Sequence, residues 1–324
     1  MDKKLIENCL IDAEFHELPN FYRGKVRDAY GLSENRRLLI STDRQSAFDK
    51  VLAAVPFKGQ VLNQTARHWF DKTSDICPNH VISYPDPNVA LVKNLDMLPI
   101  EMVVRDYMTG STETSIWPMY ERGERSLYGH SFPDELKKNQ KLPHTIITPT
   151  TKAAQGDHDA PITEAEILSS KLLSSEHWEE LSEKSLALFS RGRELAKENG
   201  LILVDTKYEF GLDENGVITV ADEIHTPDSS RYWISDTYDE RFTAGENPDS
   251  LDKEFLRLWV ASKCDPYKDP IPEIPSETLI KFGEKYIQLY EIVTGQKFEK
   301  PSLSEPVKER IRRALISELP EYFR

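Results

Sequence analysis

The segment between residues 201 and 233 constrains the fold of this chain more than any other. Two short apolar runs, at residues 201–204 and 217–220, lie on either side of the turn sequence Asp-Glu-Asn-Gly at residues 213–216. Asn-Gly tolerates the positive φ angles that tight turns require. The segment therefore predicts a β-hairpin with one apolar strand on each side of this turn.

Charged side chains alternate along the first strand of this hairpin. Successive side chains point to opposite faces of a strand, so Asp205, Lys207 and Glu209 share one face. If residues 215 and 216 form a two-residue turn, Glu209 lies directly opposite Asp222. If the turn has four residues, Lys207 lies opposite Asp222 and Glu209 is a diagonal neighbour. Either register gathers two carboxylates and one lysine on one surface.

This group of charges has two interpretations. Facing carboxylates about 5 Å apart repel each other. Mg²⁺ removes that conflict, because it commonly takes one or two carboxylates together with phosphate oxygens. Glu209 and Asp222 are therefore candidate metal ligands, and Lys207 would balance charge or contact a phosphate. The alternative is a solvated hairpin with ordinary surface charges.

Two arginines stand near small hydroxyl residues. Arg231 follows Asp-Ser-Ser and could bind a phosphate or carboxylate through two parallel hydrogen bonds, or form a structural salt bridge with a neighbouring acid. Arg105 precedes Gly-Ser-Thr at residues 110–112, whose donors suit phosphate oxygens. A plain turn is the alternative for these three residues.

A basic segment at residues 23–28 is also a candidate for ligand contact. Gly24 would let the backbone approach a ligand closely, and Lys25 and Arg27 would lie on one face of an extended strand. The spacing is not that of a P-loop. By itself the segment therefore indicates a solvated basic strand.

Two polar loops complete the set of candidates. Residues 42–49 follow a predicted strand and could present donors and acceptors to an amino-acid substrate, while helix capping by Asp43 or Ser46 is the alternative. The loop at residues 148–159 is long enough to indicate a functional role. Three adjacent side chains at residues 157–159 cannot easily converge on one ion, so substrate contact or loop structure is favoured over a metal site.

The predicted elements mix strands and helices. Strands are expected at residues 22–30, 37–42 and 98–105, with a helix at 62–70. A capping box at residues 163–166 begins a helical region, and an amphipathic helix is expected at 176–198. The C-terminal part contains further helices. This pattern predicts an α+β protein with a β-rich lobe at residues 1–104 and a larger α/β lobe at 105–324 that ends in a helical extension.

Composition excludes several classes of protein. The net charge is −14, so the chain lacks the excess of Lys and Arg that a general nucleic-acid surface needs. The three cysteines are widely spaced and form no zinc motif. No apolar run is long enough to span a bilayer, and the N-terminus lacks the apolar stretch of a secretory signal, so a cytoplasmic protein without membrane contact is expected.

Together these segments resemble the phosphoribosylaminoimidazole-succinocarboxamide synthase (SAICAR synthetase) family. The resemblance rests on motifs that occur in the family's order and cover nearly the whole chain: residues 24–28, 41–49, 104–105, 110–111, 155–159, 205–211, 222–223 and 227–231. The C-terminal stretch, with residues 236–238 and 285–295, resembles the longer version of the family.

The resemblance implies a two-lobed fold with a cleft for ATP, similar to that of protein kinases. It implies a carbon–nitrogen ligase of purine biosynthesis that uses ATP, L-aspartate and the carboxylated aminoimidazole ribonucleotide, with Mg²⁺ as cofactor. An acyl phosphate intermediate is expected. A monomer is favoured over an oligomer.

The resemblance also assigns roles to residues. Glu209 and Asp222 would hold Mg²⁺. Lys25 and Lys207 would stabilise the transferred phosphoryl group. The remaining roles are ATP binding by Gly24, Lys25 and Arg27, nucleotide binding by Arg105, Ser111, Asp228 and Arg231, and aspartate binding by Asp43, Arg44, Ser46 and Lys152.

Two other functions remain open at this point. A small-molecule kinase would use the same metal hairpin but stop after phosphoryl transfer, and ADP would then form without aspartate. A regulatory protein would bind ATP without turnover.

Overall fold

The computed structural model describes residues 2–48, 50–112, 115–152 and 160–323. Asp49 of the polar segment at residues 42–49 and residues 153–159 of the polar loop at 148–159 fall outside these ranges. The chain divides into two compact units. Unit 1 comprises residues 1–68, 80–94 and 255–324, and unit 2 comprises residues 69–79 and 95–254.

Unit 1 contains a five-stranded antiparallel sheet and a separate hairpin. The order of strands in the sheet is β1-β2-β3-β7-β6. Their bounds are Phe21–Arg23, Arg27–Gly31, Arg36–Ser41, Val89–Lys93 and Val81–Asp86 in that order, and the hairpin consists of β4 (Arg44–Ala47) and β5 (Lys50–Ala54). The helices are α1 (Asp2–Glu7), α2 (Lys58–Lys72), α7 (Glu254–Ala261), α8 (Ser276–Thr294) and α9 (Val307–Glu318), of which α2 and α7 cross the division between the units.

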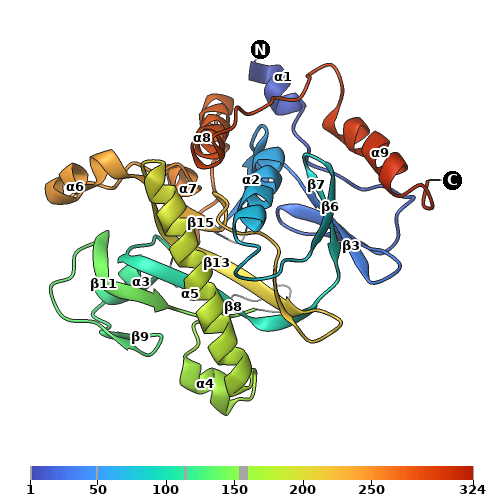
Figure 1. Cartoon of the computed structure of the whole chain (residues 1–324). Helices are drawn as coiled ribbons and strands as arrows, with labels where there is room; N and C mark the ends of the chain where they lie inside the picture. The colour runs from blue at the N-terminus through green and yellow to red at the C-terminus, as the bar shows by residue number, and fades with distance from the viewer. Residues whose placement is uncertain (1, 49, 113–114, 153–159, 324) are drawn as a thin grey trace. The chain divides into compact units, whose positions relative to one another are not determined.

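Helix α9 packs on the sheet of unit 1 although the two are far apart in sequence (Figure 1). Ile311 and Leu315 of α9 are fully buried in one cluster with Leu38, Ile40 and Leu91 of the sheet. This packing is why the compact units differ from the expected division at residues 104 and 105. Apolar side chains of the C-terminal helices find their partners in the N-terminal sheet.

A second cluster in unit 1 joins α2 to α8. Val61 and Leu62 of α2 are fully buried together with Phe282 and Tyr286 of α8. The predicted helix at residues 62–70 is confirmed and extends over Lys58–Lys72.

The expected single strand at residues 22–30 is wrong. The chain turns back on itself after Arg23, so that β1 pairs with β2 in an antiparallel hairpin with Arg23 opposite Asp28. The N–H of Gly24 donates to the carbonyl of Arg27 at 2.8 Å, which closes the turn. A Cβ atom at residue 24 would lie 2.8 Å from that carbonyl oxygen, so this close approach requires glycine.

Unit 2 contains a six-stranded sheet that runs β11-β8-β13-β14, with β12 paired to β8 and β15 paired to β13. Their bounds in that order are Gln140–Ile147, Asp96–Met108, Leu201–Leu212, Ile218–Ala221, Thr150–Thr151 and Ser230–Ile234. The other elements are α3 (Ile116–Glu121), α4 (Glu164–Ser169), α5 (Ser175–Glu198), α6 (Ser235–Ala244) and the small hairpin of β9 (Ser126–Leu127) and β10 (His130–Ser131).

Helix α5 lies across one face of this sheet (Figure 1). The hydroxyl of Ser174 caps its first turn by accepting a hydrogen bond from the N–H of His177 at 3.2 Å. Trp178, Leu181 and Leu188 are buried along one side of the helix, as the 3.6-residue period predicts. The capping box at Thr163 and Glu166 is also confirmed.

Both expected registers of the 201–221 hairpin are wrong. Glu209 lies opposite Ala221, which is the register between the two alternatives. Asp213 and Val217 close a three-residue loop, in which the carboxylate of Asp213 accepts hydrogen bonds from the N–H groups of Asn215 and Val217, both at 2.9 Å. Gly216 has a φ of 75°, as the last residue of such a loop requires.

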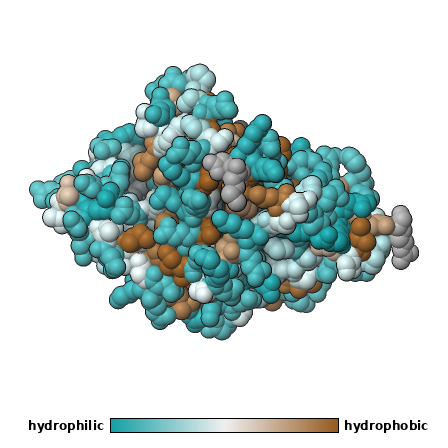
Figure 2. All heavy atoms as spheres, turned by 90° about the horizontal axis from the view of Figure 1, so that it is seen from above, coloured by the Kyte–Doolittle hydropathy of each residue, from teal (hydrophilic) through white to brown (hydrophobic). Residues whose placement is uncertain are grey.

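No helix in the described ranges is long and apolar enough to cross a membrane. On the face shown in Figure 2, hydrophilic residues predominate and apolar residues form small separate groups.

We expect Leu315→Ala to destabilise the protein by about 2–4 kcal/mol, because it leaves a cavity between α9 and the sheet. Ile316 is the matched control, since it neighbours Leu315 in α9 but is 40% exposed. Ile316→Ala should change the free energy of unfolding by less than about 0.5 kcal/mol. Urea unfolding of both variants measures the difference, and equal effects would contradict the packing of α9.

Candidate active site

One face of the unit 2 sheet carries a row of charged side chains. Strands β8 and β13 pair with Arg105 opposite Asp205 and Glu101 opposite Glu209. Because side chains alternate along a strand, these four residues and Lys207 point to the same side of the sheet. The other side is covered by α5, whose Arg193 forms an ion pair with Asp106 of β8 at 3.0 Å. The charged row is thus on the face that α5 leaves open.

Lys207 joins the two facing carboxylates. Its Nζ lies 2.5 Å from Oε1 of Glu101 and 3.0 Å from Oε1 of Glu209. Lys152 contacts the other oxygen of Glu209, and the hydroxyl of Thr150 donates to Oε2 of Glu101 at 3.1 Å. The expected lysine and carboxylate group therefore exists, but the acid opposite Glu209 comes from β8.

Glu101 was missed in the sequence although a signal for it was present. Arg105 is one of the predicted site residues, and counting back along the strand by steps of two reaches Glu101 on the same face. What the sequence did not supply was the pairing of β8 with β13, which lie about a hundred residues apart in the chain.

The pKa values follow from this arrangement. Burial by itself would raise the pKa of Glu209, but the ammonium groups of Lys207 and Lys152 outweigh it and lower the pKa to about 2. Burial would lower the pKa of Lys207, but the carboxylates of Glu209 and Glu101 raise it above its ordinary value. Asp222 adds to this effect on Lys207. Lys207 and Glu209 are therefore both charged at neutral pH.

Asp222 is near the cluster but is not opposite Glu209. It follows the last residue of β14 and has a φ of 61°, so it leaves the strand geometry that both expected registers assumed. Its carboxylate is still close enough to Lys207 to affect the pKa of that lysine.

The residues of this cluster fit a magnesium ion in part. Within the described residues, no group of three or more His, Cys, Asp or Glu side chains is arranged to hold a metal. Mg²⁺ does not need such a group, because it is often held by one or two carboxylates while phosphates and water fill its other positions. Glu209 and Asp222 have the oxygen chemistry for such a site, and both are close enough to Lys207 to raise its pKa.

A second buried charge group lies at the other end of the row. Oδ2 of Asp205 accepts hydrogen bonds from Nη1 of Arg105 at 3.1 Å and from Nη1 of Arg231 at 2.7 Å. Nε of Arg105 donates to the hydroxyl of Thr148 at 2.8 Å, and Arg231 also lies 3.7 Å from Glu254. The structure thus brings the two predicted arginines together, and the salt bridge considered for Arg231 is present.

The other two residues predicted for nucleotide binding lie in turns. Asp228 is buried in a turn in which the hydroxyl of Thr226 accepts hydrogen bonds from the N–H groups of Asp228 and Ser229, both at 3.2 Å. This turn leads into β15 and so into Arg231. Ser111 is exposed in the loop after Gly110, and no described contact places it beside the two arginines.

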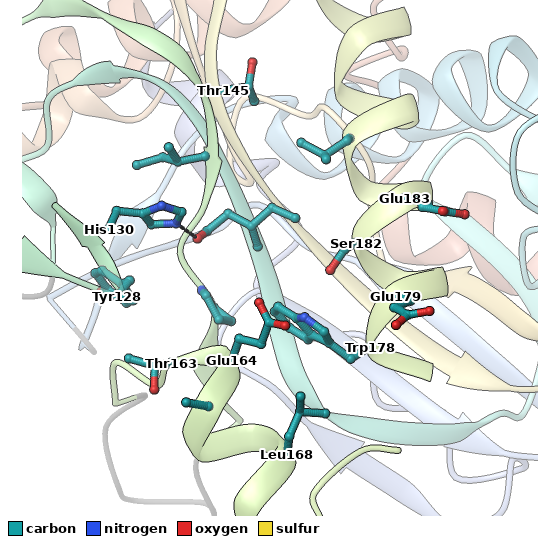
Figure 3. Close-up of a pocket in the computed structure, with 16 residues that line it drawn as sticks. Tyr128, His130, Thr145, Thr163, Glu164, Leu168, Trp178, Glu179, Ser182 and Glu183 are labelled. Carbon is teal, nitrogen blue, oxygen red and sulfur yellow. Dashed lines mark hydrogen bonds between the residues drawn. The ribbon is translucent and has the colours of Figure 1, made fainter. Parts of the chain in front are cut away.

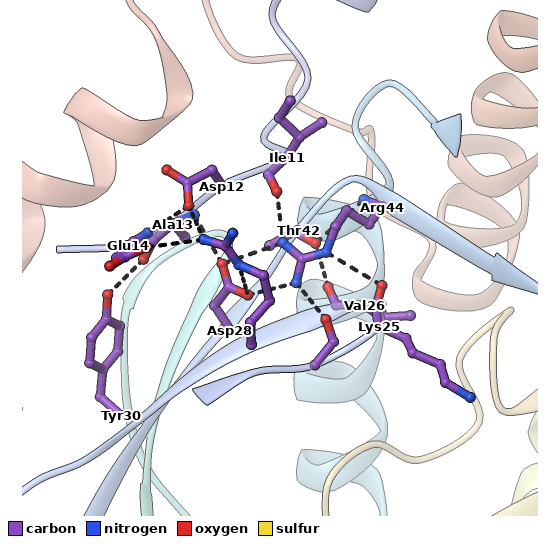
Figure 4. A network of polar contacts seen from close by, with 12 residues as sticks. Ile11, Asp12, Ala13, Glu14, Lys25, Val26, Asp28, Tyr30, Thr42 and Arg44 are labelled. Atoms are coloured by element: carbon purple, nitrogen blue, oxygen red, sulfur yellow. Dashed lines mark hydrogen bonds and ion pairs between the residues drawn. The ribbon is translucent and has the colours of Figure 1, made fainter. Parts of the chain in front are cut away.

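Unit 1 holds the remaining candidates. Lys25 is exposed in the turn between β1 and β2, Arg27 begins β2, and Ser46 is half-buried in β4. Arg44 is buried and contacts Asp28 together with backbone carbonyl groups, as Figure 4 shows.

Asp43 has the structural role that was considered as the alternative. Its carboxylate accepts hydrogen bonds from the N–H groups of Leu10 at 2.7 Å and Gly59 at 2.9 Å. Gly59 is in the first turn of α2, so Asp43 caps a helix distant in sequence. Burial raises the pKa of Asp43 to about 6.

A cavity of about 800 Å³ lies elsewhere in unit 2 (Figure 3). Its lining includes His130, Thr145, Leu168, Trp178 and Ser182. Thr145 contacts both Asp106 and Arg193, which places this part of the lining on the α5 side of the sheet. None of the predicted site residues lines the cavity, so its size does not identify the catalytic site.

We expect the contribution of Glu209 to stability to disappear in acid. Its folded pKa is about 2, below the ordinary 4.5, so the stabilisation is present above pH 4.5 and is lost as the pH falls through about 2. Glu209→Gln should therefore lower the free energy of unfolding by about 2–3 kcal/mol at pH 6, and the difference from the original protein should shrink toward pH 2.

Urea unfolding at a series of pH values measures this difference. Glu277→Gln is the control, because Glu277 pairs with Lys281 on the surface of α8 and should show no measurable effect at any pH. A difference for Glu209→Gln that stays constant down to pH 2 would show that its charge is not the source of the stabilisation.

Comparisons with known proteins show which family the chain belongs to. The family model for SAICAR synthetase matches residues 20–274. The chain is 54% identical to the phosphoribosylaminoimidazole-succinocarboxamide synthase of Legionella pneumophila (strain Paris) over 291 residues, which are 90% of this chain and 92% of that protein.

Solved structures show the same fold. The SAICAR synthase of Saccharomyces cerevisiae complexed with SAICAR superposes with a TM-score of 0.77 at 31% identity, over 90% of this chain and 99% of that one. A SAICAR synthetase in complex with ADP gives a TM-score of 0.65 at 26% identity, over 86% of this chain and 100% of that one. The chain therefore belongs to the SAICAR synthetase family, the ligases that use ATP to join L-aspartate to the carboxylated aminoimidazole ribonucleotide in purine biosynthesis.

Proposed function

We propose that this ligase works through an acyl phosphate and that the charged row on the unit 2 sheet carries the chemistry. The observation that carries the proposal is the bridging of two facing carboxylates, Glu101 and Glu209, by Lys207. This cluster offers oxygen ligands for a cation and a lysine ammonium group within a few ångströms of each other.

The chemical problem requires an activated intermediate. A carboxylate is a poor acceptor for an amine, so an oxygen of the imidazole carboxylate first attacks the γ-phosphorus of ATP, and the bond to the β-phosphate oxygen breaks to release ADP. The amine of aspartate then attacks the acyl carbon and gives up a proton, while inorganic phosphate leaves with the electron pair of the carbon–oxygen bond. No covalent bond to the enzyme is needed.

Glu209 and Asp222 are the residues that would hold Mg²⁺, which when bound supplies positive charge for the phosphates of ATP. Lys207 stabilises negative charge on the transferred phosphoryl group. Lys25 and Arg27, with the backbone at Gly24, bind the ATP phosphates. The ADP in the complex of the related SAICAR synthetase supports a nucleotide site in this fold.

The nucleotide substrate is assigned to Arg105, Ser111, Asp228 and Arg231. The common partner of the two arginines, Asp205, holds their guanidinium groups in fixed positions, which favours binding of a rigid anion. The SAICAR bound in the yeast relative supports a site for this class of molecule.

Support for the proposed aspartate site is uneven. Asp43 and Arg44 are committed to contacts within unit 1, whereas Ser46 is half-buried and Lys152 contacts Glu209. Ser46 and Lys152 are therefore the better candidates. A cytoplasmic location, a monomeric state and a functional division into an ATP lobe and a substrate lobe stay predictions.

Omission of each substrate in turn tests the reaction course. The purified protein is incubated with Mg²⁺, ATP, L-aspartate and imidazole nucleotide labelled with ¹⁸O in its carboxylate. One ¹⁸O should appear in the released phosphate in step with the succinocarboxamide, because the acyl phosphate oxygen leaves with phosphorus. Unlabelled phosphate would contradict the acyl phosphate. ADP formation without aspartate, together with a stable phosphorylated product, would indicate a kinase.

We expect Asp222→Asn to remain folded but to lose most of its ligase activity, because a proposed cation ligand loses its charge. The affinity for the divalent cation should fall about tenfold or more. The paramagnetic signal of Mn²⁺, used in place of Mg²⁺, measures this affinity in the presence of ADP. Asp213→Asn is the matched control, since it changes an aspartate in the turn of the same hairpin. Unchanged Mn²⁺ affinity in Asp222→Asn would contradict the assignment.

A further inference from the structure

A buried ion pair in unit 1 has no part in the proposed mechanism. The side chains of Arg44 and Asp28 are 9% and 0% exposed, and Nη2 of Arg44 lies 2.6 Å from Oδ1 of Asp28. Burying two charges costs several kcal/mol and is often no gain in stability over an apolar pair. General stabilisation therefore does not account for the burial of this pair.

The contacts of Arg44 converge on the turn between β1 and β2. Its Nη2 donates to the carbonyl of Gly24 at 2.9 Å, and its Nε donates to the carbonyl of Lys25 at 3.4 Å. Nη1 donates to the carbonyl of Ile11 at 2.7 Å. One guanidinium group thus ties the turn to the segment that precedes β1 (Figure 4).

Thr42 holds the next carbonyl of the same turn. The carbonyl of Val26 accepts hydrogen bonds from the N–H of Thr42 at 3.0 Å and from its hydroxyl at 2.5 Å. Three consecutive carbonyl groups, those of residues 24, 25 and 26, are therefore drawn toward Thr42 and Arg44.

The direction of these carbonyl groups determines the direction of the amides. In a planar trans peptide the N–H of a residue points opposite to the carbonyl of the residue before it. The N–H groups of Lys25, Val26 and Arg27 are thus turned away from Thr42 and Arg44. Successive amides that face one way form a concave surface for anions. The side chain of Lys25 also extends away from the Arg44 guanidinium in Figure 4.

We propose that Arg44, oriented by Asp28, is a positioning residue that fixes the backbone amides of residues 25–27 for the phosphates of ATP. It acts without touching the substrate, in contrast to the aspartate-binding role expected for it from sequence. The inference rests on the proposed placement of the ATP phosphates at this turn. It explains why a buried arginine makes five hydrogen-bond contacts next to this turn. The turn carries two basic residues, Lys25 and Arg27, that are exposed or half-exposed.

Arg44→Lys is the informative substitution. Lysine keeps a positive charge for Asp28, so the variant should fold. A single ammonium group cannot reach Asp28 and the carbonyls of Gly24, Lys25 and Ile11 together, as the planar guanidinium does. We expect the dissociation constant of Mg-ATP to rise about tenfold or more, with a matching rise in the KM for ATP. The dissociation constant of the imidazole nucleotide alone should stay within about twofold, because its proposed ligands are in unit 2.

Two further variants distinguish the possible outcomes. Arg23→Ala is the matched control, because Arg23 is half-exposed in the same hairpin, lies 3.8 Å from Asp28 and pairs chiefly with Asp12 and Glu14. It should leave ATP affinity unchanged. Asp28→Asn keeps Arg44 but removes the charge that orients it, and should weaken ATP binding in the same direction as Arg44→Lys.

Unchanged ATP affinity in Arg44→Lys would overturn the proposal. An equal loss of affinity for ATP and for the imidazole nucleotide, together with a lower Tm, would also overturn it, because Arg44 would then only maintain the fold. Lys25→Ala separates this inference from the proposed function. If Lys25→Ala and Arg44→Lys both leave ATP affinity unchanged, the phosphates are not at this turn and the underlying assignment fails. If Lys25→Ala weakens ATP binding and Arg44→Lys does not, only the role of Arg44 fails.

Discussion

The contact of Lys207 with Glu101 and Glu209 is the interaction on which the rest of the proposed site depends. The two carboxylates face each other across β8 and β13 and are largely buried, so without a cation between them they would repel and weaken the pairing of the two central strands. With Lys207 and Lys152 present, Glu209 stays ionised to low pH. The sheet can thus hold negative oxygen ligands in a place where isolated carboxylates would be costly.

A buried acid paired with basic side chains also occurs at two other points in the molecule. Asp205 lies between Arg105 and Arg231, and Asp28 lies against Arg44. Buried ion pairs of this kind contribute little net stability, but they fix the direction of each group because a misdirected charge has no partner. In each case a side chain that looked available for a ligand in the sequence is tied to its own chain. Substrates must therefore bind to groups that are already held in place.

The two faces of the unit 2 sheet carry different kinds of side chain because of strand geometry. Side chains of β8 and β13 alternate, so one set meets α5 and the other set remains for charged groups. Asp106 pairs with Arg193 of α5, whereas its neighbour Arg105 turns to Asp205. The large cavity is lined partly by residues on the α5 side. The charged row is therefore separate from this cavity.

Local features could be predicted from the sequence, and so could the family. The capping box at Thr163, the helix that ends near Asn199 and the turn after Asp213 depend on neighbours in the chain, and each was found at its expected place. The grouping of Lys207 with Glu209 was also predictable, because two residues in a strand share a face whatever the strand pairs with. The ordered set of motifs indicated the ligase family, because each motif is a short run of residues that can be identified without knowledge of the fold.

Only the tertiary structure decided what stands opposite those residues. A three-residue loop in place of two or four moved Asp222 out of line with Glu209, and the pairing of β8 with β13 supplied Glu101. The carbonyl of Gly24 likewise accepts a hydrogen bond from Arg44, which belongs to another strand. The packing of α9 on the N-terminal sheet joined the two ends of the chain in one unit. Such contacts link residues far apart in sequence, and their formation depends on how the whole apolar surface is buried, which no local pattern encodes.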